Sequence, residues 1–172
     1  MIPIISIVGK SNSGKTTLLE RLIAELKRRG YRVGTIKHDV HGFDIDRPGK
    51  DSWRHAQAGS DVVVIASPNR LALIRRLERE LSLDEVARYF SDVDIILTEG
   101  YKRGDKPKIE VSRREVSEEL LCTQEELVAV ATDHPVDVDV PQFALDDAVG
   151  LVNLLEERFL RGAADPKGFE NP

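Results

Sequence analysis

The chain is poor in cysteine and in long apolar runs. Cys122 is the single cysteine among 172 residues, so no disulfide can form within the chain, and a reducing compartment suits this composition. No apolar run approaches the roughly 20 residues that span a bilayer, and the apolar N-terminus lacks the basic leader of a signal peptide. We therefore expect a cytoplasmic protein without a membrane partner.

A surplus of basic charge is also missing. The formal net charge is −5, whereas proteins that bind nucleic acid over a wide surface are usually basic, so we expect no nucleic-acid partner. Charged residues make up 32% and hydrophobic residues 41% of the chain, as in globular proteins. The length predicts one domain over residues 1–161, and the polar residues 162–172 are expected to form a flexible tail.

Strand-like and helix-like segments alternate along the chain. This order predicts an α/β domain of three layers, with a mostly parallel sheet, helices on both faces and a β-hairpin extension. Strands are expected over residues 4–8, 32–37, 61–66, 71–74, 93–98, 107–111 and 127–132. Helices are expected over residues 15–28, 51–58, 82–90 and 146–159. The segment 4–8 is almost continuously apolar, as a strand covered on both faces is.

Residues 9–16, between the first strand and the first helix, fit the pattern G-x-x-x-x-G-K-[ST] in full. Glycines at both ends let the backbone curl, so that its N–H groups point at phosphate oxygens. The helix N-terminus that follows favours an anion. Lys15 would reach the β- and γ-phosphates, and the hydroxyl of Thr16 would bind Mg²⁺. The pattern predicts the P-loop NTPase fold, with a triphosphate bound at residues 9–16.

Strand 93–98 leads into an acid, Glu99. The carboxyl ends of parallel strands share one edge of a sheet, so Glu99 is expected beside the phosphates. There it would hold a metal-bound water or orient the attacking water. Asp94, near the start of the same strand, is interpreted as structural.

The polar loop at residues 38–50 follows the second strand at the same expected edge. Lys37 is interpreted as a phosphate contact, and Asp39 or Asp46 as a contact to metal or water, with the choice between them left open. His38 and His41 are weak evidence for zinc, because no further ligands complete a set.

Asp133 follows the last predicted main strand. Its carboxylate would accept hydrogen bonds from the N1 and N2 groups of guanine, which adenine cannot offer. An aspartate that starts a turn before Pro135 is an equal alternative, so guanine is favoured only slightly over adenine. The basic segment 101–108 is either a solvated turn or a contact to a phosphate-bearing ligand, and Trp53 is interpreted as a packing residue.

Four segments together resemble the MobB family of molybdopterin-guanine dinucleotide biosynthesis adapter proteins. They are GKSNSGKTTL at 9–18, TIKHD at 35–39 with FDID at 43–46, DSWRH at 51–55 continuing through Gly59, and LTEGYK at 97–102. The resemblance extends from about residue 4 to residue 133, and its last three segments are much more specific than the first.

The resemblance implies a homodimeric, GTP-binding protein with weak hydrolysis. It would assist the guanylyltransferase that joins GMP to molybdopterin, with molybdopterin or its guanine dinucleotide as a further partner. The residues expected to bind phosphate are Gly9, Asn12, Ser13, Gly14, Lys15, Thr16 and Thr17. The resemblance implies Thr16 and Glu99 for Mg²⁺, to which we add Asp46 as a candidate, and Thr132 with Asp133 for guanine. Lys15 and Glu99 are the candidate catalytic residues for hydrolysis.

Two other functions fit the same loop. A kinase of a small metabolite would need little more than the P-loop and Glu99 as base. Its lid arginines would be Arg75 and Arg76 or Arg113 and Arg114, although we interpret both pairs as solvated charge. A partitioning-type ATPase would carry an extra lysine early in the loop, where Lys10 stands.

Overall fold

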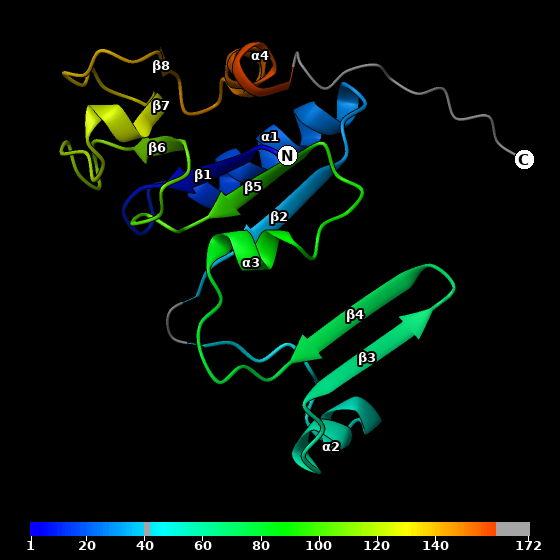
Figure 1. Cartoon of the computed structure of the whole chain (residues 1–172). Helices are drawn as coiled ribbons and strands as arrows, with labels where there is room; N and C mark the ends of the chain where they lie inside the picture. Colours follow the sequence, from blue (N-terminus) through cyan, green and yellow to red (C-terminus); the bar gives the residue numbers. More distant parts are fainter. Residues whose placement is uncertain (40–41, 161–172) are drawn as a thin grey trace, which may run out of the picture. The chain divides into compact units, whose positions relative to one another are not determined.

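The computed structural model describes residues 1–39 and 42–160 and divides into two compact units (Figure 1). The first unit comprises Met1–His38 and Ala87–Pro172, and the second comprises Asp39–Val86. The expected tail at 162–172 and two loop residues, Val40 and His41, lie outside the described residues. A single domain over 1–161 therefore stays a prediction.

The first unit is built on a six-stranded sheet. Its strands are β2 (Val33–Lys37), β5 (Ile95–Glu99), β1 (Ile4–Val8), β6 (Lys108–Ser112), β7 (Leu127–Thr132) and β8 (Gln142–Phe143), in this spatial order. Every neighbouring pair is parallel, which confirms the predicted α/β class. Strand β8 was not predicted from the sequence, because a strand of two residues has no period to detect.

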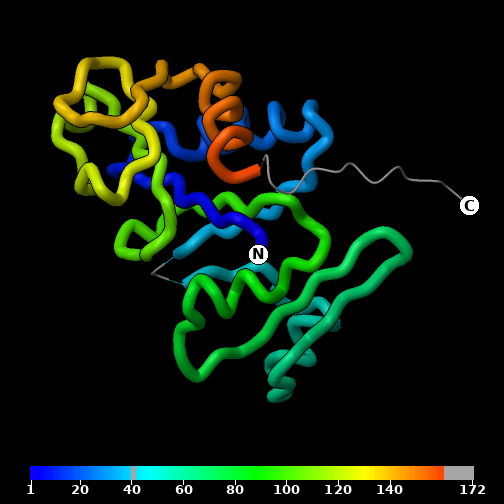
Figure 2. The backbone as a smooth tube through the Cα atoms, turned by 45° about the horizontal axis from the view of Figure 1, so that its top comes forward, coloured from blue at the N-terminus to red at the C-terminus, as the bar shows by residue number. Residues whose placement is uncertain are grey.

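Two helices cover one face of this sheet. The predicted helix at 15–28 is confirmed as α1 (Lys15–Arg28), and α4 (Ala148–Leu155) lies beside it (Figures 1 and 2). Alternate strand residues turn toward these helices, so Ile5, Ile7, Ile95 and Leu97 join the leucines of α1 in one core. The predicted closing helix at 146–159 begins at Ala148, because the Asp147 side chain caps it at Gly150 N (2.8 Å), and it ends in a π-helical segment, Glu156–Leu160.

On the opposite face of the sheet, irregular segments pack against β1 and β7. Val8 and Val130 pack there against Leu127 and Cys122. The covering chain includes a 3₁₀ helix, Gln124–Glu126, which was not predicted from the sequence. Burial, together with the nearby Glu110 carboxylate, raises the pKa of the Cys122 thiol to about 12. Cys122 is therefore a core residue and not an activated thiol.

The second unit holds a short helix and a hairpin. Helix α2 (Asp51–Gln57) precedes the antiparallel strands β3 (Val62–Ser67) and β4 (Arg70–Arg75), which confirms the predicted hairpin. The predicted helix at 82–90 is present as the shorter α3 (Leu83–Ala87), which follows Ser82, whose Oγ accepts a hydrogen bond from Glu85 N (3.3 Å). Among the described residues, no helix is both long and apolar enough to cross a membrane.

Candidate functional site

Three residues with positive φ curl the loop at 9–16 between β1 and α1. They are Gly9 at +143°, Asn12 at +64° and Gly14 at +101°. A Cβ on Gly9 would stand 2.5 Å from the carbonyl oxygen of Val111 in β6. The backbone of β6 therefore leaves room only for glycine at position 9. The predicted curl of the loop is present, and its binding of phosphate stays a prediction.

Lys15 lies across its own loop. Its Nζ donates to the carbonyl oxygen of Lys10 at 2.8 Å, and the same oxygen accepts a hydrogen bond from Ser13 N at 3.3 Å. Burial lowers the pKa of Lys15 below its usual 10.5, and the negative charge of Glu99 partly opposes this shift. A phosphate oxygen would replace a neutral carbonyl with an anion as the partner of this ammonium group.

Thr16 and Glu99 meet at the loop, as predicted. The Oγ1 of Thr16 donates to Oε1 of Glu99 at 2.9 Å. The parallel register places Glu99 beside Ile7 of β1, and the amide of Gly100 donates to the Ile7 carbonyl. These oxygens suit Mg²⁺, which takes few protein ligands and completes its shell with phosphates and waters. The described residues contain no cluster of three or more His, Cys, Asp or Glu side chains that could hold a metal alone.

Lys37 and His38 stand at the same sheet edge. Lys37 of β2 lies opposite Glu99 of β5 in the strand register. The amide of His38 donates a hydrogen bond to the Glu99 carbonyl at 3.0 Å. The ring of His38 stacks on Tyr101 with centroids 4.4 Å apart. Gly100 has a φ of +106°, and a Cβ there would lie 3.2 Å from the Cβ of His38. His38 is thus engaged in packing, while its possible zinc partner, His41, lies outside the described residues.

Asp39 and Asp46, the two acids left open for metal, belong to the second unit. The Oδ1 of Asp46 accepts hydrogen bonds from Arg47 N at 2.8 Å and Ser52 Oγ at 3.0 Å. Its Oδ2 is buried and has no hydrogen-bond partner in the described structure. Contact of Asp46 with the metal therefore stays a prediction.

Thr132 and Asp133 form a turn with His134 at the end of β7. The hydroxyl of Thr132 donates to the His134 carbonyl at 2.8 Å, so it shapes this turn. The Oδ1 of Asp133 contacts His134 Nδ1 at 3.0 Å and accepts from Arg114 N at 2.8 Å. These hydrogen bonds, led by that of His134, keep the pKa of Asp133 below its usual value. An ionised carboxylate at this position can accept hydrogen bonds from a base.

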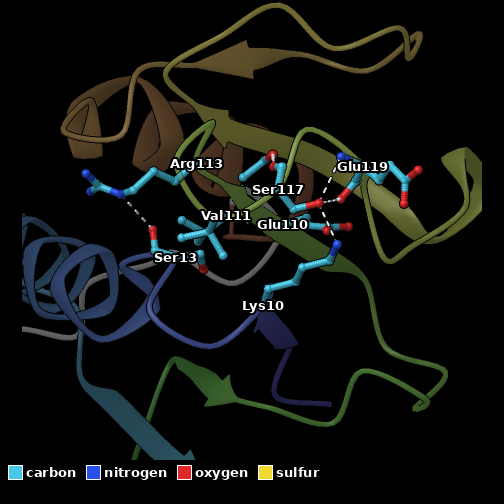
Figure 3. Close-up of a pocket in the computed structure, with 9 residues that line it drawn as sticks. Lys10, Ser13, Glu110, Val111, Arg113, Ser117 and Glu119 are labelled. Carbon is cyan, nitrogen blue, oxygen red and sulfur yellow. Dashed lines mark hydrogen bonds between the residues drawn. The ribbon is translucent and has the colours of Figure 1, made fainter.

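Strand β6 contributes residues to the site that were not predicted from the sequence. Arg113, the first residue after β6, reaches over the loop, and its Nε lies 3.4 Å from the carbonyl oxygen of Ser13 (Figure 3). On the same side, Lys10 donates to the hydroxyl of Ser117 (Figure 3). The missing information was the strand order, because Arg113 lies at the edge where the loop begins only if β6 is a parallel neighbour of β1.

Asp94 and Arg114, which were interpreted as a structural acid and a solvated base, have local partners. Asp94 accepts the Arg32 amide through Oδ2 at 2.6 Å, which confirms its structural role. The Nε of Arg114 lies 3.6 Å from the carboxylate of Glu118, on an exposed surface.

Known proteins are similar to this chain in sequence and in fold. The pattern of the family described as Molybdopterin guanine dinucleotide synthesis protein B (MobB) matches residues 4–133. The molybdopterin-guanine dinucleotide biosynthesis adapter protein of Haemophilus influenzae is 44% identical over 140 residues, which cover 80% of this chain and 79% of the relative. Its namesake in Escherichia coli is 39% identical over 163 residues, which cover 91% and 93%. The crystal structure of Bacillus subtilis MobB matches with a TM-score of 0.73 and 31% identity, over 91% of this chain and 98% of that one.

Proposed function

Because the chain belongs to the MobB family of molybdopterin-guanine dinucleotide biosynthesis, we propose that it is a GTP-binding adapter. In this role it assists the guanylyltransferase that attaches GMP to molybdopterin, and it contacts molybdopterin or its guanine dinucleotide. The observation that carries the nucleotide-binding part is the hydrogen bond between Thr16 and Glu99, 2.9 Å long, at the mouth of the loop.

The triphosphate is held by the curled loop and by Lys15. Backbone N–H groups near the start of α1 favour an anion, and the helix dipole adds to this preference. Lys15 already spans the loop to the Lys10 carbonyl, so its ammonium group needs only a small movement to reach a phosphate oxygen. Thr16 and Glu99 hold Mg²⁺ directly or through its waters.

Guanine is read by Asp133 in this proposal. Oδ1 of Asp133 is engaged by Arg114 N and His134, whereas Oδ2 has no hydrogen-bond partner among the described residues. Oδ2 accepts from guanine N1–H or N2–H. Adenine has an acceptor at N1 and would face the carboxylate unfavourably.

Hydrolysis is slow in this proposal. A fast NTPase needs a residue that orients the attacking water against the γ-phosphate. Glu99 is the candidate, but its Oε1 already accepts the Thr16 hydroxyl and shares the metal site. Glu99 therefore serves the metal first, and nucleotide binding acts mainly through the adapter's partner.

A reducing cytoplasm suits a chain whose single cysteine is buried.

A second copy of the chain covers one face of the β3–β4 hairpin. Directly paired strand residues share a face, and four apolar side chains with relative exposures of 40–72% gather on one such face: Val62, Val64, Leu71 and Leu73. A two-stranded sheet is marginally stable alone, so burial against a twin hairpin would stabilise it. Leu71→Asp should then convert a homodimer to a monomer in sedimentation velocity.

The central test is a titration of the whole chain with GTP and with ATP in Mg²⁺. We expect tighter binding of GTP, and a loss of roughly a hundredfold or more in Lys15→Ala, because the charged contact to the phosphates is removed. Equal binding of both nucleotides would remove the role of Asp133. No binding of either would refute the GTP-binding adapter.

The adapter role needs a separate measurement. Transfer of GMP to molybdopterin by the guanylyltransferase should rise when the chain and GTP are both present. Lys15→Ala should not give this rise, although it should still fold. Equal stimulation by the unchanged chain and by Lys15→Ala would separate the adapter role from nucleotide binding.

A further inference from the structure

Arg113 is a charged residue that lies against the loop at 9–16 and has no role in the function described so far. Its Nη2 lies 3.4 Å from the position that a Cβ on Gly14 would occupy, so the guanidinium packs on the first turn of α1. Among the described residues, the one hydrogen bond of its side chain, from Nε to the carbonyl oxygen of Ser13, is long at 3.4 Å. The donors on its two Nη atoms have no partner among the described residues.

The backbone around Arg113 is held firmly. Its carbonyl accepts hydrogen bonds from the amides of Val116 and Ser117, both at 2.9 Å. The next amide, that of Arg114, donates to Asp133 at 2.8 Å. The guanidinium therefore projects from a fixed turn. When it binds a ligand, the backbone has little freedom left to lose, and the entropic cost is mainly that of ordering the Arg113 side chain.

Ser13, the loop residue that Arg113 contacts, carries a buried polar side-chain atom. The Oγ of Ser13 is buried and has no hydrogen-bond partner in the described structure. Ser13 and Arg113 both line a small hollow beside the loop, together with Lys10 and Ser117 (Figure 3). Among the described residues, the Ser13 hydroxyl and the Nη donors of Arg113, which extends from the hollow over the loop in Figure 3, therefore both lack partners that an acceptor-rich ligand could supply.

The order of the strands indicates which part of a bound nucleotide would lie beside Arg113. Along the sheet edge, Glu99 ends β5, the loop follows β1, Arg113 follows β6, and Asp133 follows β7. If the proposed function is right, the γ-phosphate and Mg²⁺ lie toward Glu99, and guanine lies toward Asp133. The α-phosphate, which joins the two ends, then faces Arg113.

We propose that Arg113 binds the α-phosphate of the nucleotide through its Nη atoms. Guanidinium suits this task, since its planar fork matches two phosphate oxygens and it stays charged at every relevant pH. This inference rests on the proposed function, because it needs a nucleotide in the loop. It adds a residue on the guanine side of the loop, where the sequence motif has none.

The test compares two neighbouring arginines, each changed to glutamine. Arg113→Gln should weaken GTP and GDP by the same factor, roughly tenfold or more, because both nucleotides carry the α-phosphate. The loss should be equal with Mg²⁺ and with EDTA, because the contact does not pass through the metal. Arg114→Gln removes the same charge, but its side chain points to Glu118, so binding should change by less than about twofold.

A second variant, Arg113→Lys, separates the effect of charge from that of the guanidinium shape. The melting temperature of each variant shows whether it is folded. Arg113→Lys retains the charge without the fork, and it should lie between the unchanged chain and Arg113→Gln. A loss in Arg113→Gln for GTP alone would overturn the assignment to the α-phosphate. Unchanged binding by a folded Arg113→Gln would overturn the inference and leave the proposed function standing, whereas no binding by the unchanged chain would overturn both.

Discussion

On one side of the loop at 9–16, β5 brings the Glu99 carboxylate to the Thr16 hydroxyl at 2.9 Å. On the other side, β6 brings the Val111 carbonyl to within 2.5 Å of a Cβ built on Gly9, and Arg113 lies over Gly14. We call these sides the β5 flank (Thr16, Glu99) and the β6 flank (Val111, Arg113, Ser117). The β5 flank offers ligands for a cation, whereas the β6 flank shapes the loop and offers donors for an anion. A phosphate–metal complex needs both.

The comparison also separates side-chain effects from backbone effects. The β5 flank acts through two side-chain oxygens, so substitutions there should change binding while the fold persists. The β6 flank acts partly through a backbone carbonyl, which no substitution of Val111 itself can remove. Its effect is therefore tested most directly from the residue that the carbonyl approaches, Gly9.

The largest effect is expected for Gly9→Ala on the β6 flank. The new methyl group meets the Val111 carbonyl at 2.5 Å, and φ is +143°, so strain and overpacking together should cost about 3 kcal/mol or more of unfolding free energy. Chemical denaturation measures this loss, and nucleotide binding should fall with it. Gly30→Ala is the control, since Gly30 has a φ of +91° but nothing within 4 Å, and about 1 kcal/mol is expected. Equal losses at the two glycines would mean that the Val111 carbonyl does not constrain the loop.

A smaller, selective effect is expected for Glu99→Gln on the β5 flank. The amide oxygen can still accept from Thr16, but the charge that attracts Mg²⁺ is gone. The gain in GTP affinity on adding Mg²⁺ should shrink roughly tenfold, while affinity in EDTA should hold or rise slightly. Calorimetric titration with and without Mg²⁺ measures both. Glu20→Gln, an exposed site on α1, should behave like the unchanged chain, and a Glu99→Gln variant with full Mg²⁺ dependence would remove Glu99 from the metal site.

Lys15 lies between the flanks, and we expect the protonation of its ammonium group to make nucleotide binding depend on pH. Its pKa in the free chain is lowered from 10.5 by burial, whereas a bound phosphate would raise it, so GTP binding favours the protonated lysine. The contribution of Lys15 to GTP affinity should therefore be constant well below its free-chain pKa, and it should fall as the pH rises through that pKa, which lies below 10.5. Titrations at increasing pH test this, with Lys15→Arg as the control that stays charged. A parallel decline in Lys15→Arg would assign the pH dependence to another group.

The β5 flank was readable from the sequence. The motif at 9–16 names Lys15 and Thr16, and a buried apolar strand that ends in an acid places Glu99 at the same edge of a parallel sheet. The helix at 15–28 was predicted at its true bounds, because leucines at helical spacing begin directly after the loop and Gly30 ends them. Local patterns suffice where each element carries its own signal.

The β6 flank was not readable, because it depends on which strand lies beside β1. Spacing along the chain does not tell that β6 and β5 both pair with β1, so the approach of Val111 to Gly9 was invisible. Arg113 was therefore interpreted as solvated charge. The turn at Thr132 and Asp133 was ambiguous for a similar reason, since its hydrogen bond to Arg114 joins two separate loops.

The smallest effect is expected for Ser117→Ala, which tests whether the β6 flank holds the loop through side chains as well. The change removes the acceptor of Lys10 and the two hydrogen bonds between Ser117 Oγ and the backbone of Glu119, one from the Glu119 amide (3.1 Å) and one to the Glu119 carbonyl (3.2 Å). About 1 kcal/mol of stability and roughly twofold in GTP affinity should be lost. Ser91→Ala, whose hydroxyl bonds only its neighbour Asp92 in the described structure, is the matched control. Adding Ser117→Ala to Arg113→Gln decides how the flank works. Losses larger than additive indicate one coupled unit, whereas strictly additive losses mean that Arg113 binds the nucleotide independently of the Lys10 contact.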